Sequence, residues 1–499
     1  MSAAPAIKGW CPGALRPMLS GDGLVVRLRV PQGRLTPAQA RGVAGLATRY
    51  GNGMLDLSNR GNLQLRGVDP ARHEGLIDAL RALALIDVDE RTERRRNIMV
   101  SPFWQAGDDT DFLCQALSAA AQAHALPDVS AKFGYAVDAG PQPVLQADPA
   151  DIRFERSAQG QLLLCIEGAM RGKPVTRATA VTEAIALAEW VRAQGVTRAA
   201  RATATGAPLP AGFDCPRQAG QGTPAPGLYP SGALVACAFG QMEAETLAAL
   251  AELGPLRLTP WRRMLIEGAT RLPDLSGLIT AADDPLLRVI ACIGAPGCAQ
   301  SRGETRALAR RLAAVVPKGQ RLHVSGCAKG CAAPRATDLT LTATAPARYD
   351  LIHDGRADAL IEDARPPGPA RRAHHQLGGI HLASEIQQRF GYLIADDGVH
   401  GCAQTGGELA HPPHLRARHP CQPVASDHMN DHQFSAGFRR DTKGPADQRL
   451  GLHPAGDRHH DPLTRLPRVG DLLLGAVLLD FGHRRFGRTR GAIAFGIVE

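Results

Sequence analysis

The chain contains Leu55-Asp56-Leu57-Ser58-Asn59-Arg60-Gly61-Asn62-Leu63-Gln64-Leu65-Arg66-Gly67. This stretch aligns without gaps to a later one, Leu256-Arg257-Leu258-Thr259-Pro260-Trp261-Arg262-Arg263-Met264-Leu265-Ile266-Glu267-Gly268. Each copy reads as two short apolar runs around a polar turn, which is typical of strand, turn and strand. Upstream of the second copy, residues 232–239 match the first strand of the chain in kind. The repetition predicts two similar halves related by a pseudo-twofold axis.

The first half has clear helix and strand signals. Thr36 is placed as an N-cap, Pro37 suits the first helical turn, and Gln39 completes a capping box. Asp69-Pro70 opens a second helix in the same way. The expected elements are a strand over 23–30, a helix over 36–50, a strand over 54–57 and a helix over 69–85. This strand–helix–strand–helix order has ferredoxin-like character.

Two further blocks read as mixed α/β. The first, residues 111–200, has an expected helix over 112–124, strands over 134–138 and 162–167, and a helix over 182–194. In the second, residues 276–345, Ser301 and Glu304 have the spacing of a capping box. They predict a helix that runs to about Val316 and begins just after Cys298, where its positive end would favour a negatively charged group.

Four cysteines in the second block are spaced as two tight pairs: Cys292-x5-Cys298, 28 residues, and Cys327-x3-Cys331. Both pairs lie in glycine-rich turns, where small residues let backbone amides approach the sulfur atoms. Four thiolates of this kind are suited to a four-iron, four-sulfur cluster. A zinc site, for which closer spacing is usual, and unligated thiols are the alternatives.

Composition limits the class of protein. The 499 residues suffice for several domains, and eleven cysteines in so long a chain are no disulfide framework, so we expect a reducing, cytoplasmic environment. No apolar run reaches the roughly 20 residues that span a bilayer, and we expect no membrane partner. The net charge of +9 is not gathered in basic runs with aromatics, so we expect no nucleic acid. Scattered arginines favour a polyanionic small molecule.

The character of the chain changes near Pro366. The stretch 366–499 holds 13 of the 17 histidines and one lysine, with poor periodicity. The histidines do not have metal-ligand spacing. Because Arg greatly outnumbers Lys, the gene is expected to be rich in GC, and a shifted reading frame would give this composition. We therefore expect an irregular tail, out of frame or disordered, with a divergent real extension as the alternative.

The cysteine spacing, the repeat and the arginine-bearing turns resemble the sulfite and nitrite reductase family. Within it, the chain is most similar to the precorrin-3B synthase branch. Four stretches carry this similarity: Trp10-Cys11-Pro12-Gly13, residues 21–28, the turn after Leu57, and Leu258-Thr259-Pro260-Trp261-Arg262. The resemblance covers about residues 8–360. It implies an α+β fold: ferredoxin-like half-domains over 14–86 and 225–275, mixed α/β domains over 87–205 and 276–360 (the second binding the cluster), and the tail over 366–499.

The resemblance also implies site residues. Cys292, Cys298, Cys327 and Cys331 would hold the cluster, and in the reductases the residue matching Cys331 also bridges to siroheme iron. Arg60, Arg96 and Lys132 match catalytic, tetrapyrrole-facing positions. The expected substrate-binding residues are Arg60, Gln64, Arg66, Arg96, Asn97, Lys132, Arg262 and Lys329. Here Gly134 replaces the second lysine of the reductases' lysine-phenylalanine-lysine strand, and Gly61 replaces a glutamine. Sulfite reduction needs clustered cations, so this loss favours the synthase branch.

For that branch the resemblance implies conversion of precorrin-3A with dioxygen into precorrin-3B, in aerobic cobalamin biosynthesis. Ring carbon C20 is hydroxylated and the ring A acetate closes a γ-lactone. The cluster would supply electrons, and a mononuclear non-haem iron is implied without identifiable ligands. No Gly-x-Gly-x-x-Gly follows a strand, so an NADH-linked reductase or small electron carrier is the expected partner. The alternatives are a siroheme-dependent sulfite or nitrite reductase and a non-catalytic tetrapyrrole-binding iron–sulfur protein.

Overall fold

Two sheets with the same strand order form the centre of the computed structural model, which describes residues 11–359. The first has the order β1-β2-β5-β4-β14 and the second β12-β13-β16-β15-β3, with β17 also on β13. The first half supplies β1 (Met18–Ser20), β2 (Gly23–Leu28), β3 (Arg34–Leu35), α1 (Pro37–Tyr50), β4 (Met54–Leu57), β5 (Leu63–Val68) and α2 (His73–Ala82). The second supplies β12 (Gly227–Tyr229), β13 (Gly232–Cys237), β14 (Gln241–Glu243), α7 (Ala244–Ala251), β15 (Leu256–Leu258), β16 (Arg263–Glu267) and β17 (Leu278–Ile279).

The predicted pseudo-twofold repeat is confirmed, and the halves are linked by an exchange of strands. Strand β3 of the first half pairs antiparallel with β15 of the second, and β14 of the second pairs with β4 of the first. Each half therefore completes the sheet of the other. The exchange was not predicted, because β3 and β14 are too short to show a periodic pattern.

The aligned turns also share their backbone conformation. Gly61 has φ 65° in the first copy, and its counterpart Arg262 has φ 62° in the second. This left-handed conformation is easy for glycine and uncommon for a bulky side chain. Arg262 is thus held in a strained conformation, a feature that recurs at functional sites.

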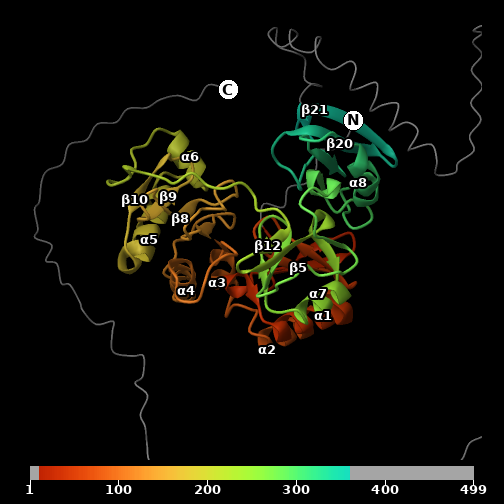
Figure 1. Ribbon diagram of the computed structural model, residues 1–499, viewed down its shortest axis with the longest axis horizontal. Coiled ribbons are helices and arrows are strands. Elements are labelled where there is room, and N and C mark those ends of the chain that lie inside the picture. Colours follow the sequence, from red (N-terminus) through yellow and green to blue (C-terminus); the bar gives the residue numbers. More distant parts are fainter. Residues whose placement is uncertain (1–10, 360–499) are drawn as a thin grey trace, which may run out of the picture. The chain divides into compact units, whose positions relative to one another are not determined.

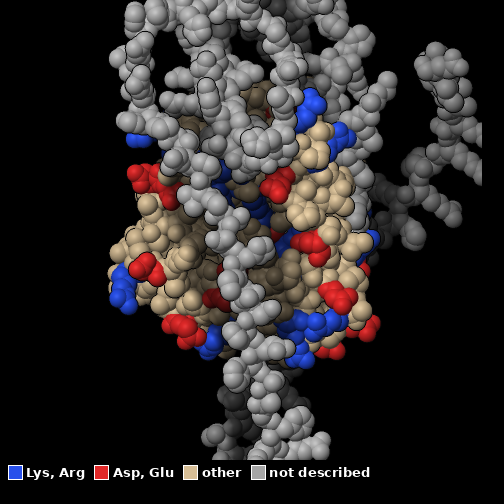
Figure 2. Space-filling view, turned by 90° about the vertical axis from the view of Figure 1, so that its right-hand side faces the viewer, with Lys and Arg blue, Asp and Glu red and all other residues tan. Residues whose placement is uncertain are grey.

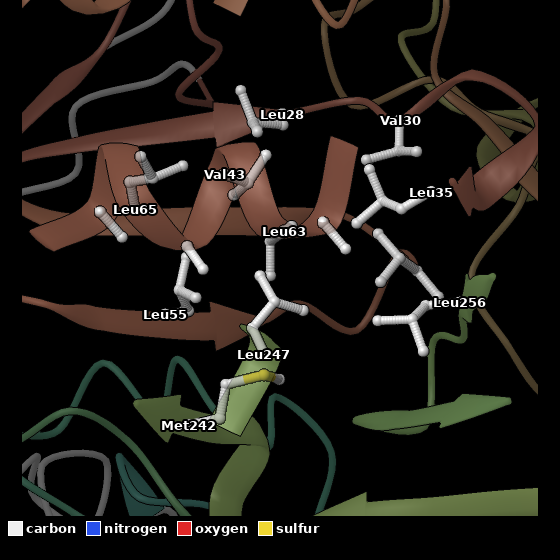
Figure 3. Close-up of a cluster of buried hydrophobic side chains, with 14 of the residues drawn as sticks. Leu28, Val30, Leu35, Val43, Leu55, Leu63, Leu65, Met242, Leu247 and Leu256 are labelled. Carbon is white, nitrogen blue, oxygen red and sulfur yellow. The ribbon is translucent and has the colours of Figure 1, made fainter. Parts of the chain in front are cut away.

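One hydrophobic core serves both halves. The same buried cluster contains residues of both halves (Figure 3). They include Leu28, Leu63 and Leu65 from the first half and Met242, Leu247 and Leu256 from the second. Helices α1 and α7 lie side by side along the two sheets, with α2 next to α1 (Figure 1). The predicted capping box of Thr36 and Gln39 is present at the start of α1. The second predicted helix begins as a 3₁₀ turn over Pro70–Arg72 and continues as α2.

The third sheet has the order β11-β10-β9-β8-β7-β6. Its elements are α3 (Glu90–Arg95), β6 (Ile98–Val100), α4 (Asp109–Gln122), β7 (Tyr135–Val137), β8 (Ile152–Arg156), β9 (Leu162–Ile166), β10 (Arg171–Pro174), α5 (Arg177–Ala193), α6 (Ala199–Ala204) and β11 (Cys215–Pro216). Helices α4 and α5 pack against each other. Strand β8 was missed because its charged residues, Arg153 and Glu155, are buried and form ion pairs.

The fourth sheet has the order β18-β19-β20-β21, formed by β18 (Val289–Ala291), β19 (Leu322–Ser325), β20 (Thr337–Ala345) and β21 (Arg348–Gly355). Helix α8 (Arg306–Leu312) packs against β18. The remaining 3₁₀ turns are Pro31–Gly33, Ala238–Gly240, Pro285–Arg288 and Ala313–Val315. The expected helix start just after Cys298 is wrong, because α8 begins at Arg306 and lacks a side-chain cap. The hydroxyl of Ser301 donates to the carbonyls of Gly303 and Gly326 instead.

The structure bears on the expected fold class and on the absence of membrane-spanning helices, but not on the domain limits or the tail. The α+β fold with its ferredoxin-like halves is confirmed, while the domain limits stay a prediction. Among residues 11–359, none of the helices combines the length and apolar character that crossing a membrane requires. The tail expected over 366–499 lies outside the described residues.

Candidate functional site

The two cysteine pairs leave the same edge of the fourth sheet. Cys292 follows β18 directly and Cys327 lies two residues after β19, and these strands are parallel neighbours in which Ala291 pairs with Val324. Parallel neighbours bring their carboxyl ends together. The sheet thereby gathers two pairs that are 28 residues apart in the sequence.

Hydrogen bonds within the first loop determine its shape. The amide of Cys298 donates to the carbonyl of Gly294 at 2.8 Å, and Gly294 has φ 71°. The hydroxyl of Thr305 donates to the carbonyl of Cys292 at 2.6 Å. A Cβ at Gly294 would lie 2.9 Å from the amide nitrogen of Thr305, so only glycine fits there. These contacts fix the conformation of the loop that carries Cys292 and Cys298.

Backbone amides also reach the sulfur atoms. The amide of Gly326 donates to Cys292 Sγ at 3.2 Å, and the amide of Lys329 donates to the thiol of Cys327. A Cβ at Gly326 would collide with Ser301 Oγ and lie 3.5 Å from Cys292 Sγ. Burial raises the pKa of Cys327. Amide donors of this kind stabilise thiolates and cluster sulfur.

All four cysteines line one cavity of about 260 Å³. Four arginines share its wall: Arg27 on β2, Arg66 on β5, Arg262 in the turn between β15 and β16, and Arg306 on α8. Arg306 Nη2 donates to Asp56 Oδ1 at 2.9 Å, while its buried Nε and Nη1 have no partner among the described residues. Buried donors without partners are costly, so these two atoms suit a bound acceptor.

The donor set fits an iron–sulfur cluster. Within residues 11–359, no group of three or more His, Cys, Asp or Glu side chains is placed to hold a single metal ion. Each thiolate of a four-iron cluster binds a different iron atom, so four thiols around a cavity need not converge on one point. Four thiols and sulfur-directed amides are features that suit a cluster.

A larger cavity of about 490 Å³ shares part of this wall. Asn59, Phe239, Arg262 and Ala332 line both cavities. The guanidinium of Arg262 donates to the carbonyl of Ala332, next to Cys331, at 3.2 Å. Burial and next the charge of Arg306 lower the pKa of Arg262. Arg262 therefore connects the cysteine cavity with a space suited to a larger ligand.

Two other predicted residues belong to the cysteine cavity but already have partners. Gln64 Oε1 accepts two hydrogen bonds from Arg27, at 3.0 and 2.8 Å. Arg66 is paired with Asp22 at 2.8 Å and with Asp56 at 3.6 Å, and donates to the carbonyl of Gly297 at 3.1 Å. It attaches the loop before Cys298 to β5. Lys329, the remaining predicted residue in the cysteine region, is exposed.

The other predicted residues do not line either cavity. Arg96 is buried and paired with Asp87 at 2.6 Å, and Asn97 Nδ2 donates to the carbonyl of Phe133 at 2.9 Å. Lys132 lies in an exposed turn ahead of β7. Arg60 is half-buried, and burial, followed by the charge of Arg198, lowers its pKa. The catalytic and substrate roles of these residues stay predictions.

Gly134 has a steric reason to lack a side chain. A Cβ there would lie 2.8 Å from Asn97 Nδ2 and 3.0 Å from Arg60 Nη1. The guanidinium of Arg60 and the amide of Asn97 occupy the space that a lysine would enter. The departure from the reductases is thus coupled to the packing of neighbouring residues.

We expect Gly134→Ala to lower the unfolding free energy by about 1–3 kcal/mol, because the added methyl group overpacks a filled site. Shifts in the midpoint of urea denaturation would measure the effect. Gly140→Ala is the matched control, since a Cβ there meets nothing within 4 Å. Equal midpoints for the two variants would contradict the packing explanation.

Sequence reasoning missed several residues that line the cavities. Arg27 faces Gln64 across β2 and β5, and burial and the charge of Arg29 lower its pKa to about 10. Its position in an alternating strand beside the repeated turn was the available signal. Arg306 and Asp148 gave no signal, because their surroundings are formed by residues far away in the sequence.

Positive and negative side chains are mixed on the face of the described residues that Figure 2 shows. In Figure 2, Lys and Arg side chains are interspersed with Asp and Glu side chains among the described residues. Exposed ion pairs of the described residues include Arg81 with Asp78 and Arg94 with Asp128. The functionally interesting arginines are those that line the cavities.

Three comparisons show which known proteins this chain is similar to. The family model of the nitrite/sulfite reductase ferredoxin-like half domain matches residues 16–83. The chain is 30% identical to a precorrin-3B synthase from Sinorhizobium sp over 71% of this chain and 84% of that protein. It is 27% identical to a ferredoxin–nitrite reductase from Synechococcus elongatus over 65% of this chain and 77% of that protein. Among solved structures, the NirA protein of Mycobacterium tuberculosis has a TM-score of 0.49 and 16% identity, covering 64% of this chain and 70% of that one.

Proposed function

The chain belongs to the precorrin-3B synthase family and is an enzyme of that kind, and we propose that it converts precorrin-3A into precorrin-3B with dioxygen. In this reaction C20 of the ring is hydroxylated and the ring A acetate closes a γ-lactone. The observation that carries the proposal is that Arg262 lines both the cavity of the four cysteines and the larger, arginine-lined cavity beside it. An electron carrier and a polycarboxylate substrate would lie next to each other there.

Cys292, Cys298, Cys327 and Cys331 would hold a four-iron, four-sulfur cluster, which supplies electrons when bound. The amides of Gly326 and Lys329 would remain directed at sulfur. This role follows from the cavity that the four thiols line and from the iron–sulfur chemistry of the wider family. A mononuclear non-haem iron would also take part. Within residues 11–359, no group of three or more His, Cys, Asp or Glu side chains is placed to bind it.

Arginines would hold the substrate. Precorrin-3A carries many acetate and propionate groups, and arginine forks bind carboxylates with two parallel hydrogen bonds. Arg262 lines both cavities, and Arg263, Arg321 and Arg335 line the larger one. Several forks around one cavity would fix the ring in one orientation. Arg66 would act indirectly, by holding the loop of Cys298 in place.

Electrons would come from an NADH-linked reductase or a small carrier, because the sequence has no dinucleotide-binding fingerprint. Cys331 is an exposed cysteine of the cavity, and Lys329 beside it is exposed too. The cluster would therefore lie close to the surface, where an electron-donating partner could approach it.

The decisive experiment is anaerobic purification and cluster reconstitution, followed by incubation with precorrin-3A, a reductant and isotopically labelled dioxygen. We expect the product mass to increase by one labelled oxygen atom. Tight binding of precorrin-3A without product would favour a non-catalytic tetrapyrrole-binding protein instead.

The nitrite reductase relatives supply the second candidate, a siroheme-dependent sulfite or nitrite reductase. Purified enzyme with the visible absorption of siroheme, and with six-electron reduction of sulfite or nitrite, would replace the proposal by this alternative. The space filled by Arg60 and Asn97 at Gly134 favours the synthase.

A further inference from the structure

Asp148 differs from every other group in the wall of the larger cavity. Of the described residues that line this cavity, it alone carries a carboxyl group. The cavity's other charged side chains are arginines, which stay protonated, and burial raises the pKa of the Cys237 thiol to about 12. Asp148 is thus the one lining group that can exchange a proton near neutral pH.

The position of Asp148 is well defined by its neighbours. Its Oδ2 accepts a hydrogen bond from Trp261 Nε1 at 2.8 Å, and its backbone carbonyl accepts one from Arg153. Trp261 belongs to the repeated turn and directly precedes Arg262. Among the described residues Oδ1 has no hydrogen-bond partner, which leaves this oxygen available to a ligand in the cavity.

The proposed reaction needs protons in this cavity. Substrate, dioxygen, two electrons and two protons give the oxygenated ring and one water molecule. The O–O bond breaks, one oxygen atom goes to the ring, and the other leaves as water after taking up protons. The electrons come from the NADH-linked donor, and the protons are taken up by the oxygen atom that leaves as water.

We propose that Asp148 is the proton-donating residue of the larger cavity. The proton on its carboxyl group goes to the oxygen atom that leaves as water, and solvent then reprotonates the carboxylate. The role rests on the proposed function, since it needs the oxygen chemistry to take place beside Arg262. A carboxyl group among arginines would otherwise oppose the binding of a polycarboxylate, so its presence calls for such a role.

The raised pKa of the Asp148 carboxyl group is suited to proton donation. Burial raises its pKa to about 6, against the hydrogen bond from Trp261 and the charges of Arg153 and Arg335, which lower it. Arg262, Arg263 and Arg321 line the same cavity. Because the pKa is raised, the acid form predominates below about pH 6 and is lost as the pH rises through that value. If this form is the donor, kcat falls toward alkaline pH.

Asp148→Asn tests the role with little change in shape, because the amide oxygen can still accept from Trp261. We expect kcat to fall by about 100-fold or more, within the range for loss of a general acid, while the Kd for precorrin-3A stays within a few fold. The decline of kcat above about pH 6 should disappear. Asp78→Asn, at an exposed pair with Arg81, is the control for an equal change of charge.

Trp261→Phe separates proton donation from a purely structural role. Without the indole N–H the carboxylate is less stabilised, so the decline of kcat should move to higher pH. Wild-type kcat and pH profile in Asp148→Asn would overturn the inference. So would identical profiles for Asp148→Asn and Trp261→Phe, since Asp148 would then only anchor the indole. Absence of product from the wild-type enzyme would instead refute the proposed function itself.

Discussion

Cys331→Ser is expected to abolish cluster binding and turnover together. Serine is a poor ligand for iron–sulfur clusters, and the cavity offers no spare thiol, since its other three cysteines each have a position of their own in the wall. After anaerobic reconstitution we expect the iron and acid-labile sulfide content to drop to background. The visible absorption of the iron–sulfur cluster should disappear as well. Product formation from precorrin-3A should fall below detection.

Cys215→Ser is the matched control, because Cys215 is a half-buried thiol that lines neither cavity. It should keep its cluster and its activity. A Cys331→Ser protein that binds a full complement of iron and turns over normally would refute the assignment of the four ligands. Circular dichroism of both variants separates loss of the cluster from loss of the fold.

Arg66→Met is expected to have the largest effect on stability. The side chains of Arg66 and Asp56 are only 6% and 8% exposed, and removal of one member of a buried ion-pair network costs about 3–5 kcal/mol because the partner charges remain, with Arg306 then the remaining ion-pair partner of Asp56. Asp22 and the carbonyl of Gly297 also lose a donor. The midpoint of urea denaturation should fall, and cluster occupancy should fall with it, because the loop of Cys298 is released from β5.

Arg41→Met provides the comparison. Arg41 and its partner Glu252 are largely exposed, and such pairs contribute about 0–1 kcal/mol. A small, equal shift for both variants would show that the buried network around Arg66 contributes little. A large shift with full cluster occupancy would separate stability from the anchoring of the Cys298 loop.

The sequence predicted the features that depend on nearby residues. Thr36 and Gln39 mark the start of α1 because both partners of the capping box lie within one helical turn. The gapless repeat located the matched strands and turns because their residues recur in order. Ser301 and Glu304 satisfied the same local rule and failed, because Ser301 finds carbonyl acceptors at Gly303 and Gly326.

Most of the candidate site depends on contacts that no local rule describes. Arg306 meets Asp56, 250 residues away along the chain, and Trp261 meets Asp148 across 113 residues. Conversely, Arg96 had a suggestive position in the sequence, but it is paired with Asp87 and buried. The spacing of the four cysteines identified them in the sequence, while the cavities and their arginines required the three-dimensional arrangement.

The exchange of β3 and β14 also constrains how the protein can be made. When β4 leaves the ribosome its edge has no partner, and β14 follows only after the whole third sheet. At about 5–20 residues per second, translation leaves that edge open for roughly 10–40 s. Open edges invite pairing with other chains, so chaperone protection matters most in this interval. Two separately expressed halves would each expose an edge that only the other closes, and they should assemble when translated together.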